Sequence, residues 1–100
     1  MDKIFAIAKK HNLKIFEDCA QAHGASYKSR FAGTIGHASS TSFYPTKILG
    51  TFGDGGMILT DDEDVMQKIR RLRFYGMEKD EHQKESIFAT SWWWICLART

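Results

Sequence analysis

The stretch LKIFEDCA at residues 13–20, with the pattern that precedes it, limits the possible folds more than any other part of the chain. Apolar residues recur at helical spacing near the N-terminus and predict an amphipathic helix over residues 2–11. The stretch itself predicts a short strand that starts apolar and turns polar at Glu17 and Asp18. A helix followed at once by such a strand is half of a parallel α/β unit, and ligands of open α/β sheets bind beyond the carboxyl ends of the strands. Asp18 stands at that end.

The rest of the chain up to Gly76 continues in the same α/β manner. Turn residues and short apolar runs predict a hairpin, two further short strands and a second amphipathic helix, over residues 24–36, 38–44, 57–59 and 61–74 respectively. The polar tip of the hairpin is expected at residues 28–30. Asn12 is expected to end the first helix. Thr60 and Glu63 are expected to form a capping box at the start of the second.

The composition and hydrophobic pattern of the sequence change after Gly76, and this change divides the chain into residues 1–76 and residues 77–100. The second part begins with the charge run EKDEHQKE and continues into SIFATSWWWICLART, which shows no cap, turn residue or alternation. We interpret residues 77–100 as a divergent tail of the kind that a frameshift or a truncated reading frame produces. A genuine divergent C-terminus is the alternative.

Composition argues against several classes of function. One hundred residues allow at most one small domain. The formal net charge of +2 lacks the clustered cations that nucleic-acid binding needs, so we expect no nucleic-acid partner. No apolar run reaches the length of a membrane span and the N-terminus does not resemble a secretory leader, so we expect no membrane association. The two widely separated cysteines, Cys19 and Cys96, predict reduced thiols, no metal site and a cytoplasmic location.

The first cluster that could carry chemistry runs from Glu17 to His23. The Asp18 carboxylate and the Gln21 amide can face one ligand from the end of the predicted strand. The alternative is that Asp18 caps the turn that follows. A nucleophilic pair of Cys19 and His23 is a weaker hypothesis for the same cluster.

The second cluster centres on Lys47. Hydroxyl side chains at Ser40, Thr41 and Ser42 precede it, and glycines follow it at Gly50 and in the GDGG stretch. Hydroxyls and exposed backbone amides suit a phosphate, and a desolvated lysine amine can form a Schiff base with an aldehyde. The alternatives are a solvated surface lysine and a plain turn at GDGG.

The order and separation of the two clusters resemble a known family. The segments EDCAQAHGASYKSRFAGTIG, SFYPTKILGTFGDGGMILT and RRLRFYGM look like the motifs of the DegT/DnrJ/StrS nucleotide-sugar aminotransferases, over about residues 1–79. The resemblance implies an α/β fold. The chain would be a central part of the three-layer α/β/α large domain of a type I, aspartate aminotransferase-like transferase that depends on pyridoxal 5′-phosphate.

The resemblance also implies roles at the matching positions. Asp18 would pair with the ring nitrogen of the cofactor, Gln21 would bind its phenolic oxygen, and Ser42 would contact its phosphate. Lys47 would be the catalytic residue. It would bind the cofactor covalently and then move a proton between the amino-acid donor and the cofactor.

The implied reaction is the transfer of an amino group, typically from glutamate, to a nucleotide-linked keto sugar, in polysaccharide biosynthesis and by a homodimeric enzyme. Members of this family are several times longer than this chain, so we expect the chain alone to be inactive and to bind the cofactor weakly or not at all. The alternative is a non-catalytic interaction protein, or a remnant, that binds a partner or a membrane surface through its Trp-rich tail.

Overall fold

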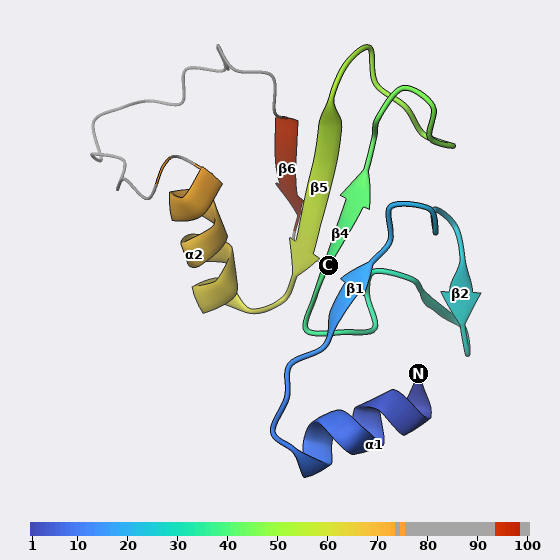
Figure 1. Cartoon of the computed structure of the whole chain (residues 1–100), viewed down its shortest axis with the longest axis vertical. Coiled ribbons are helices and arrows are strands. Elements are labelled where there is room, and N and C mark those ends of the chain that lie inside the picture. Colours follow the sequence, from blue (N-terminus) through green and yellow to red (C-terminus); the bar gives the residue numbers. More distant parts are fainter. Residues whose placement is uncertain (74, 76–93, 99–100) are drawn as a thin grey trace.

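The computed structural model describes residues 1–73, 75 and 94–98. The helices and strands of this part are α1 Asp2–Lys10, β1 Phe16–Asp18, β2 Ser26–Tyr27, β3 Arg30–Phe31, β4 Ala38–Ser42, β5 Gly55–Thr60, α2 Glu63–Arg73 and β6 Trp94–Ala98. One sheet has the strand order β1-β4-β5-β6, and β2 pairs with β3 in a separate hairpin (Figure 1). Helix α2 packs against β5, and α1 lies beyond the amino end of β1 (Figure 1).

The pairing of β1, β4 and β5 brings one end of each of these strands to the same edge of the sheet. β1 and β4 run parallel with Asp18 opposite Ser40, so their carboxyl ends point the same way (Figure 1). β5 runs antiparallel to β4 with Gly56 opposite Ser42, so the amino end of β5 returns to the same edge. The polar segments after β1 and β4 therefore meet beside the GDGG stretch, where an α/β sheet typically binds its ligand.

Local sequence signals predicted the first half of the fold well. Helix α1 ends at Lys10, and Asn12 follows with a φ of 52°, a left-handed conformation common after helices. The hairpin turns at Lys28 and Ser29, whose φ values of 50° and 63° are typical of a two-residue type I′ turn. Lys28 also forms an ion pair with Asp2, which ties the hairpin tip to α1.

The predicted capping box at the start of α2 is wrong, because Asp62 caps the helix instead. The Asp62 carboxylate accepts hydrogen bonds from the backbone N–H groups of Asp64 at 3.0 Å and Val65 at 3.2 Å. The Thr60 hydroxyl is held elsewhere, since it donates to the carbonyl of His37 at 2.8 Å and accepts from the N–H of Asp62 at 3.1 Å. Thr60 therefore belongs to the end of β5, and the helix begins later.

The two edge strands of the sheet differ from the prediction. β1 is limited to the residues that pair with β4, so the apolar residues before Phe16 stay outside the sheet. The sequence does not predict β6, which pairs in parallel with β5 over residues 94–98. A continuous apolar run without alternation, such as WICLA, is typical of a parallel strand. The charge run and the first two tryptophans of the tail lie outside the described residues.

The buried core of the described part is small. Its buried apolar residues are Ala8, Cys19, Ile35 and Met66, of which Met66 lies on α2. Large apolar side chains remain exposed in the loop between β4 and β5, for example Ile48 with 81% of its surface accessible. Neither α1 nor α2 has the length and apolar character of a helix that crosses a membrane.

Replacement of the observed helix cap tests its contribution to stability. Asp62→Ala removes the acceptor of two helical N–H groups, so we expect the free energy of unfolding to fall by about 1 kcal/mol. Urea denaturation followed by circular dichroism measures this change. Lys68→Ala is the matched control, because Lys68 is exposed on the same helix and its loss should alter stability by less than about 0.5 kcal/mol. Equal stabilities of the two variants would contradict the cap.

Candidate active site

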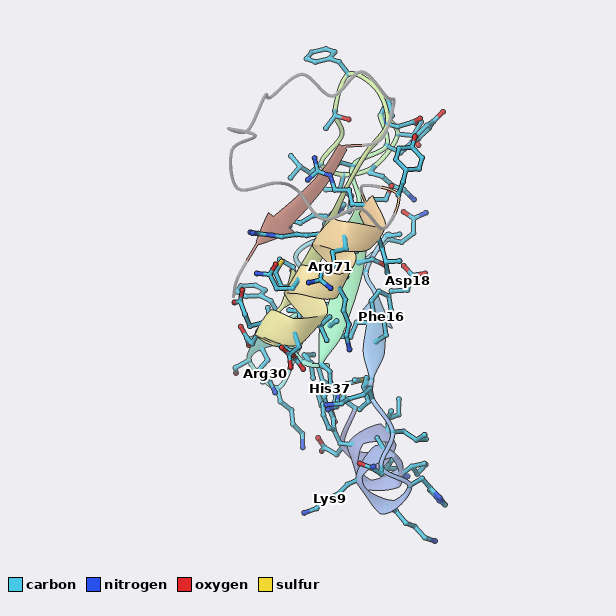
Figure 2. All side chains as sticks on the ribbon, turned by 90° about the vertical axis from the view of Figure 1, so that its left-hand side faces the viewer. Lys9, Phe16, Asp18, Arg30, His37 and Arg71 are labelled. Carbon is cyan, nitrogen blue, oxygen red and sulfur yellow. The ribbon has the colours of Figure 1, made fainter. Side chains whose placement is uncertain are left out.

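Asp18 and Ser42 lie on the same face of the sheet, at the ends of β1 and β4. Asp18 is opposite Ser40 in the parallel pair, and Ser42 follows Ser40 by two residues, so the three side chains share one face. Figure 2 shows Asp18 at the end of β1 that is remote from α1. Gln21 and Lys47 follow in the segments that leave these two strands.

Asp18 caps the following turn with one oxygen and leaves the other oxygen unbonded in the part that the structure describes. Its Oδ1 atom accepts a hydrogen bond from the backbone N–H of Ala20 at 3.1 Å, so the carboxylate caps the following turn. Its Oδ2 atom has no hydrogen-bond partner among the described residues, and the side chain is exposed. One oxygen therefore orients the carboxylate while the other stays available to a ligand. The exposed amide of Gln21 is likewise without a partner in the described part of the chain.

Ser42 ends β4, and Lys47 lies in the loop that follows this strand (Figure 1). The Ser42 hydroxyl oxygen accepts from the N–H of Tyr44 at 3.3 Å, which leaves its proton available to an acceptor. The N–H of Lys47 donates to the carbonyl of Tyr44 at 2.8 Å and closes a turn. Gly50 passes so close to Pro45 that a Cβ atom would lie 2.7 Å from the Pro45 carbonyl oxygen, so a side chain does not fit there.

Glu17 has a role that the motifs did not indicate, because its carboxylate holds the segment that leads into β4. Its Oε2 atom accepts from the N–H of Gly33 at 3.0 Å, and its Oε1 atom accepts from Ile35 at 2.8 Å and Gly36 at 2.6 Å. Partial burial alone would raise the pKa of Glu17, but these donors and the Arg30 guanidinium hold it below its ordinary value of 4.5. The ionised carboxylate therefore fixes residues 33–36 against β1.

Close packing around this segment supports the Glu17 contact. Gly36 approaches β1 so closely that a Cβ atom would lie 2.9 Å from the carbonyl oxygen of Ile15. Ser39, which is 1% exposed, donates its hydroxyl proton to the carbonyl of Gly33 at 2.7 Å. An acidic residue inside a short apolar strand, followed by a glycine-containing loop, is the sequence signal that could have identified this contact.

The hypothesis that Cys19 and His23 form a nucleophilic pair is wrong. Burial raises the pKa of the Cys19 thiol above its ordinary value of 9.0, and the carboxylates of Glu17 and Asp18 raise it further. The His23 imidazole bonds to Thr41 instead, with 2.8 Å between Nε2 and Oγ1. The thiol is therefore protonated near neutral pH and has no base to activate it in this cluster.

Comparison with known proteins identifies the family. The model of the DegT/DnrJ/EryC1/StrS aminotransferase family matches residues 1–91, so the chain belongs to this family. The match extends past the motifs that carry the resemblance in the sequence. The chain is 51% identical over 79 residues to a dTDP-3-amino-3,4,6-trideoxy-alpha-D-glucose transaminase of Micromonospora megalomicea subsp. nigra, which covers 79% of this chain and 21% of that protein.

Solved structures of the family confirm the predicted α/β fold class. A DegT DnrJ EryC1 StrS aminotransferase from Brucella abortus matches with a TM-score of 0.74 and 37% identity, over 84% of this chain and 22% of that one. S. venezuelae DesV, solved in complex with a ketimine intermediate, matches with a TM-score of 0.71 and 42% identity, over 85% of this chain and 23% of that one. The chain thus spans about a fifth of the length of these relatives.

Aminotransferases of this family use pyridoxal 5′-phosphate, and the polar atoms at the sheet edge are compatible with that group. The free Oδ2 atom of Asp18 is an acceptor suited to a protonated ring nitrogen. The Ser42 hydroxyl has a proton to donate to a phosphate. Lys47 is a half-buried residue whose amine has no partner in the described ranges, and a lysine amine is a group that can bind an aldehyde.

Removal of the Glu17 charge should change how stability depends on pH. The folded-state pKa lies below 4.5, so the unfolded chain binds the proton first as the pH falls. The stabilisation is therefore complete above about pH 4.5 and is lost as the pH falls through the folded-state pKa. Glu17→Gln keeps the shape but not the charge. We expect its melting temperature to fall less steeply than that of the wild type between about pH 5 and pH 3.

Asp2 provides the control for this experiment. Its hydrogen-bonded ion pair with Lys28 lowers the pKa of Asp2, so this exposed pair contributes to the same acid range. The melting temperature should still fall less steeply with pH in Glu17→Gln than with Glu17 present when both chains also carry Asp2→Asn. Parallel pH profiles of the wild type and Glu17→Gln would contradict the role of the carboxylate.

Proposed function

We propose that residues 1–76 form the lysine-bearing part of the active site of a pyridoxal 5′-phosphate-dependent aminotransferase. Its substrate would be a keto sugar linked to a nucleoside diphosphate. The observation that carries the proposal is that, in a member of this family, Asp18 and Ser42 end neighbouring strands and Lys47 follows in the next loop, and each offers an unused polar group. The name of the Micromonospora relative supports the substrate class.

Asp18 and Gln21 would hold the ring of the cofactor. The Oδ2 atom of Asp18 would accept a hydrogen bond from the protonated ring nitrogen, and the Gln21 amide would donate a hydrogen bond to the phenolic oxygen. When bound, the cofactor supplies an electron sink that stabilises negative charge at the α-carbon of the amino donor. Asp18 serves this chemistry by keeping the ring nitrogen protonated. Its Oδ1 bond to Ala20 would keep the carboxylate oriented for that contact.

Ser42 and Lys47 would act at the phosphate and at the reacting carbon. The Ser42 hydroxyl would donate its proton to a phosphate oxygen. The Lys47 amine would hold the cofactor at its aldehyde carbon and, when free, would act as a general base toward the α-carbon proton of the amino donor. The turn closed by the Lys47 N–H on the Tyr44 carbonyl, and the close approach of Gly50 to Pro45, would limit the positions that this amine can reach.

The proposal extends to the partners and setting of the whole enzyme. A glutamate donor, a homodimer and a cytoplasmic location belong to it, as does the division of the chain after residue 76. Because the chain spans about a fifth of its relatives' length, we expect these residues alone to bind the cofactor weakly rather than to complete the reaction. The alternative of an interaction protein depends on the Trp-rich tail, which no described contact favours.

Chemical trapping of Lys47 tests the proposal. The full chain is mixed with pyridoxal 5′-phosphate, reduced with borohydride and digested, and mass spectrometry locates the modified lysines. We expect Lys47 to be modified more than the exposed lysines, because Asp18 and Ser42 would hold the cofactor beside it. Asp18→Asn weakens a charge-assisted contact and should lower the modified fraction of Lys47 by about tenfold at limiting cofactor.

Lys14→Ala is the control for non-specific labelling, because Lys14 is exposed and lies before β1. It should leave the modification of Lys47 unchanged. Labelling of every lysine in proportion to its exposure, with no effect of Asp18→Asn, would rule out a cofactor site at this edge.

A further inference from the structure

His23 is the centre of a contact network that the proposed function does not use. Its ring stacks on Phe43, with 5.8 Å between the centroids and 7° between the planes. Its Nε2 atom lies 2.8 Å from the Oγ1 atom of Thr41. Thr41 directly precedes Ser42 in β4, so the two side chains lie on opposite faces of the sheet. The network is therefore on the reverse side of the sheet from the side chains of Asp18 and Ser42.

The hydrogen bonds of Thr41 determine which ring nitrogen of His23 carries the proton. The Thr41 hydroxyl has a single proton, which it donates to the carbonyl of Cys19 at 3.2 Å. Its oxygen can then only accept from His23, so Nε2 is protonated. In the other tautomer a buried Nδ1–H group would lack an acceptor among the described residues, and such orphaned N–H groups are rare. Both considerations select the Nε2–H tautomer.

Cys19 connects this network to the turn that carries Asp18. The Cys19 carbonyl accepts from the Thr41 hydroxyl and from the N–H of Ala22 at 3.0 Å. The Cys19 N–H donates to the carbonyl of Ser40 at 2.8 Å, which continues the ladder between β1 and β4. Both polar backbone groups of the residue after Asp18 are therefore attached to β4.

We propose that His23, as the Nε2–H tautomer, is a positioning residue for Asp18. By donating to the Thr41 oxygen, it directs the Thr41 proton onto the Cys19 carbonyl and fixes the turn of Asp18 and Gln21 against β4. Stacking on Phe43 holds the imidazole in the plane that this bond requires. The ligand that Asp18 would bind rests on the proposed function. The tautomer of His23 and the fixed turn do not depend on that function.

Nuclear magnetic resonance of the ¹⁵N-labelled full chain tests the tautomer in the wild type, without any substitution that could disturb folding. For the neutral imidazole of His23 we expect a proton-bearing, pyrrole-like Nε2 and a pyridine-like Nδ1. The resonances are assigned by their disappearance in His23→Phe, which keeps an aromatic ring against Phe43. A pyridine-like Nε2 of His23 would overturn the inference.

Amide hydrogen exchange at Ala20 and Ala22 tests the fixed turn. Thr41→Val removes the hydroxyl at nearly constant volume and should accelerate exchange at both amides by about tenfold. Thr41→Ser keeps the hydroxyl and is the matched control, for which we expect exchange within about twofold of the wild type. His23→Phe, which lacks the donor, should resemble Thr41→Val. Unchanged exchange in Thr41→Val would show that the network does not hold the turn.

The trapping of Lys47 then links the network to the cofactor. Thr41→Val should raise the cofactor concentration needed for half-maximal modification by about tenfold, and Thr41→Ser should restore the wild-type value. If Thr41→Val and the wild type needed the same cofactor concentration for half-maximal modification, although amide exchange was faster in Thr41→Val, the positioning role would be overturned. Absence of specific Lys47 modification in the wild type would instead contradict the proposed function and leave the tautomer result standing.

Discussion

The Glu17 carboxylate is the contact on which the arrangement around the site depends. It accepts hydrogen bonds from three backbone N–H groups of the segment that leads into β4. Glu17 itself lies on β1, a strand of only three residues. Hydrogen bonds to a charged group typically contribute about 1.5–3 kcal/mol each. Few apolar side chains of the described part are fully buried. This polar contact therefore adds to the attachment between β1 and the segment before β4 where full apolar burial is sparse.

This contact reaches the site through the register of two strands. Because residues 33–36 lead directly into β4, fixing them against β1 sets Glu17 opposite Ser39 and Asp18 opposite Ser40. The bond between the Thr41 hydroxyl and the Cys19 carbonyl repeats this attachment just beyond Asp18. Asp18 is thus flanked along the chain by hydrogen bonds that attach the residues before and after it to β4 and the segment leading into β4. Lys47 is placed differently, by a closed turn after β4.

The sequence predicted those features that depend on local signals. The left-handed Asn12, the hairpin tip and the two helices follow from propensity and turn chemistry within a few residues. The sequence also predicted that Asp18 would stand at the carboxyl end of its strand, where β1 ends. The role of Glu17 was missed because its donors lie 16 to 19 residues along the chain, so that only the acidic residue inside an apolar strand hinted at it. The cap of α2 was missed because Thr60 is held by His37 from another strand end, a contact that no local pattern encodes.

Side chains of β1 alternate between the two faces of the sheet, so neighbouring residues of this strand serve different purposes. Glu17 and Cys19 serve attachment to the scaffold, whereas Phe16 and Asp18 lie on the other face, where both side chains are exposed. Selection for a new ligand can therefore alter one set while the other is conserved. Insertion or deletion of a single residue in the strand would exchange the two sets and place the scaffold carboxylate on the ligand side. Substitutions should thus be tolerated far better than length changes in this segment.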